Sequence, residues 1–417
     1  MSPRPSFPSA LLVCLPALLV LATVVWSQEQ QVLHHFQIRL SAAIGNIEYG
    51  SRISNPSLVD RGREKIADLL TETATAPVRN IRVGDQAWKY LFTPDGRYLA
   101  SAGREFIREG ANSHPVEIWE TETGVRRHLL DGAGSPIRCL ALTPDGKELI
   151  AGDFAGVANV WSMETGKRLR SFACDRISEM AVSPDGNRVI VASVNGVLSD
   201  GKKGSILVFD RRTGTLLQTV PEEGDSVSSL AVAPDGMRVA LGTHDDAVKI
   251  YDLGTARMIR KLPGSGKHYY TTALCFSPDG QRLFSGNQGN TIRIWDWRSG
   301  RLLRTVDGMA EVAREGVANG IHALILSLDR RELIAGNDKG SIRVCHADTG
   351  QLLRTLQADA SVVRVMVTSD GKRLWAAAME GRIRSWLRPP AFPESLASGA
   401  LAPAVLRQRL PFFLRAL

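Results

Sequence analysis

The chain has 417 residues, of which 44% are hydrophobic and 23% are charged, so it can bury a sizeable core and does not have a disordered composition. Its formal net charge is +8, but Lys and Arg are scattered, which favours a solvated basic surface over a specific nucleic-acid site. Five cysteines without a CxxC pair and eight histidines without metal-ligand spacing indicate small buried side chains rather than a disulfide framework. We therefore expect no metal and no cofactor.

An apolar run opens the chain, from Ala10 to Trp26, after a single Arg4 and before a polar stretch. Its 17 residues fall at the short end of what crosses a hydrocarbon core of ~30 Å. Residues 1–27 are therefore predicted to be an apolar helix that acts either as a cleaved signal peptide or as a retained signal anchor. In both cases the positive end stays inside, and the rest of the chain is expected on the non-cytoplasmic side of the membrane.

Residues 28–76 lack the repeat that fills the rest of the chain. Asn55 and Pro56, followed by apolar residues at 66, 69 and 70, predict a short capped helix. This segment is expected to be a helical linker or a cap.

A four-residue turn then occurs seven times. In its full form it is Ser, Thr or Ala followed by Pro-Asp-Gly. Proline presets φ, aspartate can bond its own backbone, and glycine tolerates a positive φ, so each copy should reverse the chain between two strands. The copies start at residues 93, 143, 183, 233, 277, 327 and 368, which are 50, 40, 50, 44, 50 and 41 residues apart. The sixth copy, from Ser327 to Arg330, keeps only the aspartate.

Four apolar strands accompany each turn. One precedes it, as at residues 137–142, and two follow it, as at 148–151 and 292–295. A second turn closes on glycine and leads to a fourth strand, as at 302–306. The closing glycines are Gly124, Gly166, Gly214, Gly300 and Gly350, with Gly254 slightly displaced. Four strands at this period predict an all-β fold, a seven-bladed β-propeller of four-stranded antiparallel blades that carries an N-terminal apolar helix.

The repeat resembles the WD40 family, whose pattern LxxxPDGxxLxSG…TIRIWDxxxG is almost intact from Leu274 to Gly300. The resemblance covers about residues 77–387 and implies a ring that assembles other proteins. It is incomplete, because Trp295-Asp296 is the one true Trp-Asp pair and the Gly-His dipeptide of the family is missing. Blade stability should therefore rest more on apolar packing than on the buried His–Asp network of that family.

The seventh repeat ends after its third strand at Trp386, because the Pro-rich stretch that follows cannot continue a sheet. Residues 77–83 precede their turn by the same distance as 352–357 precede theirs. We therefore expect residues 77–83 to supply the missing outer strand, so that the two ends of the repeat region close the ring. The resulting propeller, residues 77–387, should be monomeric.

The C-terminal tail, residues 388–417, contains five prolines, four arginines and one acid. It is expected to be poorly ordered, with weak contact to a membrane surface as the alternative.

No catalytic arrangement is found in the sequence. Residues 264–267, Gly-Ser-Gly-Lys, resemble a fragment of a phosphate loop, but the earlier glycine is missing and His268 stands where Ser or Thr should bind magnesium. The repeated aspartates each belong to the same turn of a different blade, and the turn explains them. We expect no catalytic residues and no enzymatic activity.

Loop lengths point to one face of the ring. In an antiparallel blade, the second-to-third-strand turns and the connections to the next blade emerge on the same side. The long insertions at residues 104–114, 195–204 and 307–320 fall there, with the connection at 263–270. The residues expected to bind a partner on this face are Phe106, Arg108, His268, Tyr269, Tyr270 and Arg314. Insertions without a function are about equally expected for any one of these loops.

The sequence thus predicts a non-catalytic scaffold for protein–protein interactions, displayed outside the cytoplasmic membrane. Its partner would be an unidentified protein or peptide, and the membrane itself if the N-terminal segment is uncleaved. One alternative is a propeller enzyme, lactonase-like or quinoprotein-like, which needs convergent polar residues near the axis of the ring. Another is a polyanion-binding surface protein, although no specific nucleic acid is expected.

Overall fold

The computed structural model describes residues 77–83, 87–103, 115–131, 133–193, 204–222, 227–266, 269–306 and 320–388. It also describes five helical residues of the preceding segment, Arg39, Ala42, Ser57, Arg61 and Lys65. The chain divides into two compact units, Arg79–Ser385 and Met1–Val78 with Trp386–Leu417. The predicted helix at residues 10–26 and the tail after residue 388 lie outside the described residues. Among the residues that are described, no helix has the length and apolar character needed to span a bilayer.

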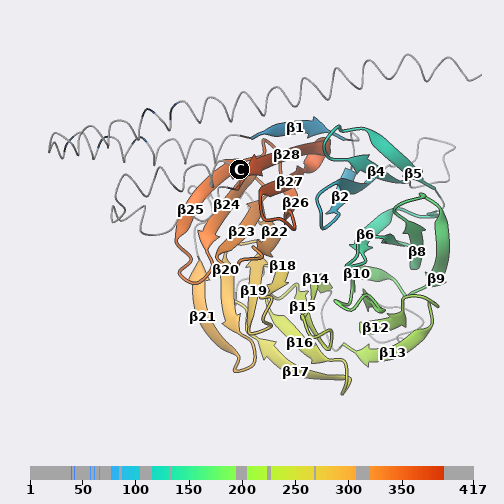
Figure 1. Cartoon of the computed structure of the whole chain (residues 1–417). Helices are drawn as coiled ribbons and strands as arrows, with labels where there is room; N and C mark the ends of the chain where they lie inside the picture. Colours follow the sequence, from blue (N-terminus) through green and yellow to red (C-terminus); the bar gives the residue numbers. More distant parts are fainter. Residues whose placement is uncertain are drawn as a thin grey trace, which may run out of the picture. The chain divides into compact units, whose positions relative to one another are not determined.

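Over the described residues, strands form seven four-stranded antiparallel sheets, which are the blades of a propeller (Figure 1). The innermost strands of blades 1 to 7 are β2 (Ala87–Phe92), β6 (Ile137–Leu142), β10 (Ile177–Val182), β14 (Val227–Val232), β18 (Thr271–Phe276), β22 (Ile321–Leu326) and β26 (Val362–Val367). The second strands are β3 (Tyr98–Gly103), β7 (Glu148–Asp153), β11 (Arg188–Ser193), β15 (Arg238–Thr243), β19 (Arg282–Asn287), β23 (Glu332–Asn337) and β27 (Arg373–Ala378). The all-β, seven-bladed architecture predicted from the repeat is confirmed.

The outer half of each blade consists of its third and fourth strands. The third strands are β4 (Val116–Glu120), β8 (Val157–Ser162), β12 (Ser205–Asp210), β16 (Val248–Asp252), β20 (Ile292–Asp296), β24 (Ser341–His346) and β28 (Arg382–Leu387). The outermost strands are β5 (Arg126–Leu130), β9 (Arg168–Ala173), β13 (Leu216–Pro221), β17 (Arg257–Leu262), β21 (Arg301–Val306), β25 (Leu352–Gln357) and β1 (Arg79–Arg82). A short 3-10 turn, η1 (Met379–Gly381), joins β27 to β28.

The core lies between neighbouring blades and is concentrated in the second and third strands. In β7, β11 and β15 five of the six residues are buried, whereas in β17 and β21 five of the six are exposed. The cause is geometric, since inner strands are covered on both faces by adjacent blades while the outer strands form the rim of the ring. The described cysteines are free thiols, and Cys139, Cys174 and Cys345 are buried, as expected of small core side chains.

The seventh blade contains a strand from each end of the propeller. Strand β1 pairs antiparallel with β28, in the register Arg79 with Ser385 and Arg82 with Arg382. The backbone N–H of Val83 extends this junction by donating to the carbonyl of Gly381 at 2.8 Å. The prediction that residues 77–83 supply the missing outer strand is confirmed by this pairing.

The repeated turn has the hydrogen bonds that its sequence predicts. In the first copy the N–H of Gly96 donates to the carbonyl of Thr93 at 2.8 Å, and Asp95 accepts from the N–H of Arg97 at 3.0 Å. The sixth copy keeps the same geometry although Arg330 replaces glycine, and Arg330 takes the positive φ of 62°.

The closing turn of blade 4, where the sequence places Gly254 slightly out of position, has no glycine at its left-handed position. In the turn between β16 and β17 the residue with positive φ is Ala256, at 55°, and Gly254 is not among the residues with positive φ. The turn between β16 and β17 requires a left-handed residue at this position, and alanine adopts that conformation at a modest energetic cost. The spacing therefore follows the other blades, and Gly254 lies earlier in the turn.

Candidate binding face

A β-bulge at the start of every innermost strand defines the inner edge of the predicted binding face. In blade 1, Ala87 pairs with Gly103 and Lys89 with Ala102, so Trp88 between them is the extra residue. The same register shift recurs in all seven blades. The bulge residues of blades 1 to 7 are Trp88, Arg138, Ser178, Ser228, Thr272, His322 and Val363. A bulge leaves its residue outside the ladder and redirects its side chain, so these seven positions can differ without breaking the sheet.

Three consecutive blades use the bulge residue to hold the next blade. The hydroxyl of Ser178 donates to the carbonyl of Val227, and that of Ser228 donates to the carbonyl of Thr271 at 2.8 Å. The hydroxyl of Thr272 donates in the same way to the carbonyl of Ile321. In blades 3, 4 and 5 this position therefore links each inner strand to the first residue of the following blade.

The other four blades, 6, 7, 1 and 2, are neighbours in the ring and have no hydroxyl at this position. They carry His322, Val363, Trp88 and Arg138 in its place. We call these four residues, with Phe154, Asp338 and Met379 from the adjoining second-to-third-strand turns, the axial sector. Phe154 and Met379 are 41% and 44% exposed. The sector thus combines aromatic, cationic and apolar side chains on one side of the ring.

Aromatic rings and cations alternate where blades 1 and 2 meet. The rings of Trp88 and Phe154 are parallel within 4°, with centroids 6.3 Å apart. The guanidinium of Arg138 lies 5.1 Å from the Phe154 centroid, and the ammonium of Lys89 lies 5.7 Å from that of Trp88. Each ring therefore has a cation nearby, which stabilises the pair while Phe154 remains exposed.

In blade 6, His322 and Asp338 form the polar end of the axial sector. The Nε2 of His322 lies 2.6 Å from Oδ1 of Asp338, and the N–H of Gly320 donates to Oδ2 at 2.8 Å. Burial acts to raise the pKa of Asp338, but the hydrogen bond and charge of His322 outweigh it and hold the pKa below its usual value. Asp338 is therefore a carboxylate at neutral pH, already engaged by its neighbours.

Charged side chains from the innermost strands surround the axis below the bulges. Lys89 lies 3.4 Å from Oε1 of Glu179, and Arg364 is exposed. Desolvation by the surrounding strands lowers the pKa of the Arg364 guanidinium. The nearby carboxylate of Glu179 partly opposes this shift. Among the described residues, Arg364 and Arg138 form no ion pair, so this part of the ring is predominantly positive.

Tyr269 and Tyr270 lie on the same face at the connection from blade 4 to blade 5. The ring of Tyr270 stacks on His244 with centroids 3.9 Å apart, and the two tyrosines are 36% and 38% exposed. Tyr269 lies over Gly289, where a Cβ atom would approach its ring to 2.5 Å. A side chain at 289 would therefore displace the ring of Tyr269 from this position.

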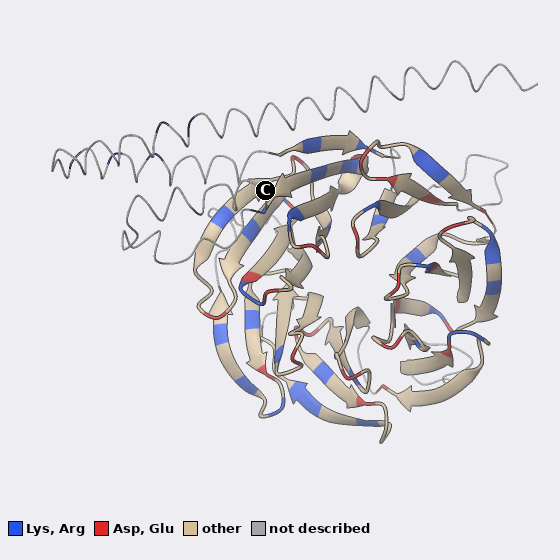
Figure 2. Cartoon of the chain, in the orientation of Figure 1, with Lys and Arg blue, Asp and Glu red and all other residues tan. Residues whose placement is uncertain are grey.

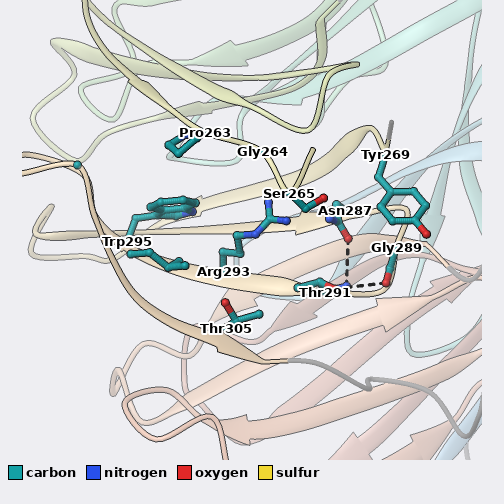
Figure 3. Close-up of a pocket in the computed structure, with 12 residues that line it drawn as sticks. Pro263, Gly264, Ser265, Tyr269, Asn287, Gly289, Thr291, Arg293, Trp295 and Thr305 are labelled. Atoms are coloured by element: carbon teal, nitrogen blue, oxygen red, sulfur yellow. Dashed lines mark hydrogen bonds between the residues drawn. The ribbon is translucent and has the colours of Figure 1, made fainter. Parts of the chain in front are cut away.

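Tyr269 also lines a pocket of about 480 Å³ between this connection and blade 5 (Figure 3). Arg293 and Trp295 lie in the pocket wall, with Arg293 pointing toward Ser265. Asn287 and Thr291 also line the pocket, and the side-chain oxygen of Asn287 accepts a hydrogen bond from the N–H of Thr291 at 3.0 Å.

The polar groups of this pocket converge on Asp246 of blade 4. Its carboxylate accepts from Arg293 at 2.8 Å, from Asn287 at 2.9 Å and from the hydroxyl of Ser265 at 2.7 Å. Burial acts to raise the pKa of Asp246, but these donors lower it overall. These hydrogen bonds join blade 4 to blade 5. Because the donors are already bonded to Asp246, the pocket offers few free polar groups to a ligand.

Of the six residues predicted to bind a partner, Tyr269 and Tyr270 are described. They occupy the predicted face, but in blades 4 and 5 and not in the axial sector. Phe106, Arg108, His268 and Arg314 lie outside the described residues. Sequence reasoning missed Trp88, Arg138, Phe154 and His322. Aligning the second residue of each innermost strand would have revealed the change from hydroxyl to aromatic or charged side chains.

Three stretches of the chain, residues 124–162, 214–252 and 257–296, match the family model described as "WD domain, G-beta repeat". The chain is a seven-bladed propeller that contains WD40 repeats. Each matched WD40 stretch contains the outermost strand of one blade and the three inner strands of the next. This offset between repeat and blade is what leaves the last blade to be completed by β1.

Parts of the chain are also similar to curated proteins, one of which is named as a WD-repeat protein. The chain is 28% identical over 152 residues to WD repeat-containing protein SL1-17 of Schistosoma mansoni, which covers 36% of this chain and 45% of the relative. It is 26% identical over 147 residues to U3 small nucleolar RNA-associated protein 21 homolog of Schizosaccharomyces pombe, 35% of this chain and 16% of the relative. It is also 26% identical over 130 residues to Periodic tryptophan protein 2 homolog of Neurospora crassa, 26% and 14% of the two chains. The matched part thus spans less than half the length of each relative.

Proposed function

We propose that this WD40 propeller is a non-catalytic scaffold that binds a protein or peptide at the axial sector. The observation that carries the proposal is the division of the seven bulge positions into two groups. Blades 3 to 5 use theirs to join neighbouring blades, whereas blades 6, 7, 1 and 2 present His322, Val363, Trp88 and Arg138. Aromatic residues and arginine are the side chains that contribute most to binding energy at protein interfaces.

The comparisons support an interaction role. WD-repeat relatives suggest a scaffold, and the relative from Schizosaccharomyces pombe is named for association with an RNA. No observation specifically favours the lactonase-like or quinoprotein-like alternative. Among the described residues, no three His, Cys, Asp or Glu side chains are grouped as they would be to hold a metal ion.

Affinity capture of partners by the full chain, compared between wild type and variants, tests this proposal. Phe154→Ala and Arg138→Gln remove one exposed ring and one cation, and each should weaken binding by about 1–3 kcal/mol while leaving thermal stability nearly unchanged. Leu217→Ser, on the exposed outer strand of blade 3, is the matched control and should bind as wild type. Partners that depend on Leu217 but not on Phe154 or Arg138 would place the interface elsewhere on the ring.

The tyrosine pair is a second part of the same proposal. We expect Tyr269 and Tyr270 to extend the binding face beyond the axial sector, because both are more than one-third exposed on the same side of the ring. Replacing both by Ala should weaken binding by about 1–3 kcal/mol. If affinity is unchanged and only the melting temperature falls, the tyrosines serve packing against His244 and Gly289 alone.

We also propose that the propeller lies on the non-cytoplasmic side of a membrane. The support is the apolar run at residues 10–26 alone. Protease added to intact cells, with any outer envelope permeabilised, should then digest the propeller or the segment at residues 28–76. Protection that ends only after the cytoplasmic contents are released would overturn this location.

A further inference from the structure

Basic residues are concentrated on the rim of the ring. The seven outermost strands contain twelve Lys and Arg residues and no Asp or Glu. Figure 2 shows this distribution, with blue bands along the outer strands and most red segments in the turns. The rim is therefore more basic than the net charge of +8 for the whole chain indicates.

The same strands expose large apolar side chains. Met258 and Ile259 of β17 are 50% and 43% exposed, and Leu302 and Leu303 of β21 are 43% and 37% exposed. Equivalent exposed pairs occur in blades 3 and 6, at Leu216-Leu217 and Leu352-Leu353. Cations on an edge strand are explained by protection against pairing with another chain, but exposed apolar pairs oppose that protection.

Strands β17 and β21 combine the two features most fully. They are the outer strands of adjacent blades, and in each of them five of six residues are exposed. Four arginines stand beside the apolar pairs: Arg257, Arg260, Arg301 and Arg304. Within the part of the chain that the structure describes, none of the four forms an ion pair, whereas Arg170 and Arg354 on other outer strands do. We call the exposed residues of β17 and β21 the rim facet.

We propose that the rim facet docks on an anionic lipid bilayer. Cationic side chains beside large apolar ones are the composition of surfaces that lie at a membrane interface, where the cations meet lipid phosphates and the apolar groups enter the headgroup boundary. The arginines favour binding to an anionic surface. The exposed apolar pairs favour a surface that also has an apolar layer, as a lipid bilayer does. Contact through the rim leaves the axial sector open to a protein partner, so this proposal does not depend on the proposed function.

Vesicle co-sedimentation with the full chain tests the rim facet. The probes are vesicles of phosphatidylcholine alone and of phosphatidylcholine mixed with phosphatidylglycerol. The N-terminal segment is present in every variant, so differences between variants report the rim. Wild type should bind the mixed vesicles more tightly, and added salt should weaken that binding because exposed charges are screened.

Two variants separate the contributions of charge and apolar surface. Replacing Arg257, Arg301 and Arg304 by Gln should weaken binding to the mixed vesicles on the order of a hundredfold, since each cation near such a surface contributes about fivefold. Leu302→Ser with Leu303→Ser should also weaken it, by about tenfold or more. The matched control is Leu216→Ser with Leu217→Ser, because β13 has an exposed apolar pair and no cation; it should bind as wild type.

Three results would overturn the proposal. The first is equal binding to both kinds of vesicle, and the second is an equal loss in the β13 control, which would indicate general adhesiveness. The third concerns a soluble polyanion, probed with polyuridylic acid. If the arginine variant loses this binding while the Leu302 and Leu303 variant still binds vesicles as wild type, the rim facet is a nucleic-acid surface. Melting temperatures of all variants within a few degrees of wild type confirm folding.

Discussion

The sixth turn has the same backbone geometry as the other six but a different residue, arginine, at its left-handed position. Gly96, Gly146, Gly186, Gly236, Gly280 and Gly371 occupy the left-handed position with φ between 63° and 72°. Arg330 takes the same position with φ of 62°, where a Cβ atom is unfavourable. The ion pair of Arg330 with Asp279, at 3.2 Å, is exposed and contributes little to offset this cost.

Arg330→Gly should therefore stabilise the propeller by about 0.5–1 kcal/mol, because relief of the left-handed conformation exceeds the lost surface pair. Urea unfolding of the variant and wild type measures the difference. The reciprocal control, Gly280→Ala, introduces a Cβ at φ of 63° and should destabilise by about 1 kcal/mol or more. A loss of stability in Arg330→Gly would show that the ion pair outweighs the backbone.

The turn aspartates predict how stability depends on pH. The pKa values of Asp145, Asp185 and Asp279 are lowered first by a hydroxyl that donates from Thr143, Ser183 or Ser277, and next by a backbone N–H. In the unfolded chain these groups titrate near a pKa of about 3.9. Their contribution to stability is therefore present above about pH 4 and is lost as pH falls through the lower folded pKa values, since the unfolded state then binds more protons.

Denaturant unfolding at a series of pH values from neutral to acidic measures this slope. Asp185→Asn should be less stable than wild type at neutral pH and should lose less stability on acidification. Asp210→Asn provides a comparison in the other class of turn, where the N–H and hydroxyl of Thr213 lower the pKa. If the free energy of unfolding falls equally with pH in wild type and Asp185→Asn, the acid dependence comes from other carboxylates.

At the level of elements, closure of the ring depends on the shortest outer strand. Strand β1 contributes four residues, which pair with four of the six residues of β28, from Arg382 to Ser385. The N–H of Gly381 donates to the hydroxyl of Tyr90 at 3.0 Å, so the last blade is also held to the first at its inner side. Burial raises the pKa of Tyr90 to about 12, which keeps this hydroxyl protonated across the physiological range.

Deleting residues 79–82 should lower the melting temperature of the whole propeller. The deletion exposes the edge of β28 and removes the junction between the two ends, which a closed ring needs in order to unfold cooperatively. Asn80→Ala, an exposed position of the same strand, is the control and should change stability by less than about 0.5 kcal/mol. A deletion variant that melts with wild type would show that three strands suffice for the seventh blade.

At the scale of the whole molecule, buried polar groups connect successive blades. Glu222, at the end of blade 3, pairs with Lys249 of blade 4, and these side chains are 1% and 8% exposed. The hydroxyl of Tyr251 donates to the same oxygen of Glu222 at 3.3 Å. Asp246 and Arg293 form the next such connection, between blades 4 and 5. A buried pair of this kind adds little over apolar packing, but losing one partner is costly.

Lys249→Met should therefore destabilise the propeller by about 3–5 kcal/mol, because Glu222 is left charged and buried. Combining it with Glu222→Gln removes the charge and keeps an acceptor for Tyr251, so the double variant should recover most of the loss. Thermal and urea unfolding of the two variants and of Glu222→Gln alone complete the cycle. Equal stability of the single and double variants would mean that the cost comes from packing around Lys249.

The amino-acid sequence was sufficient to predict the repeat, and with it the seven blades, the Asp turns and the closing strand at residues 77–83. These are local or periodic features, since turn chemistry acts within four residues and strand alternation within one blade. It also placed the tyrosine pair on the face of the ring that carries the inter-blade connections, because antiparallel strand order fixes where each loop emerges. The closing turn of blade 4 shows the limit of this local reasoning, since Ala256 takes the left-handed position that glycine occupies in the other closing turns.

Which residues of that face lie together could not be predicted from the sequence and depends on how the blades pack. Trp88 and Phe154 belong to different blades and are 66 residues apart, and their stacking depends on a bulge and on the rotation from one blade to the next. The rim facet likewise depends on which strand of each blade is outermost, because the same alternating pattern would be buried in a second or third strand. Sequence periodicity specifies each blade, but exposure and contact between blades arise only when the ring closes.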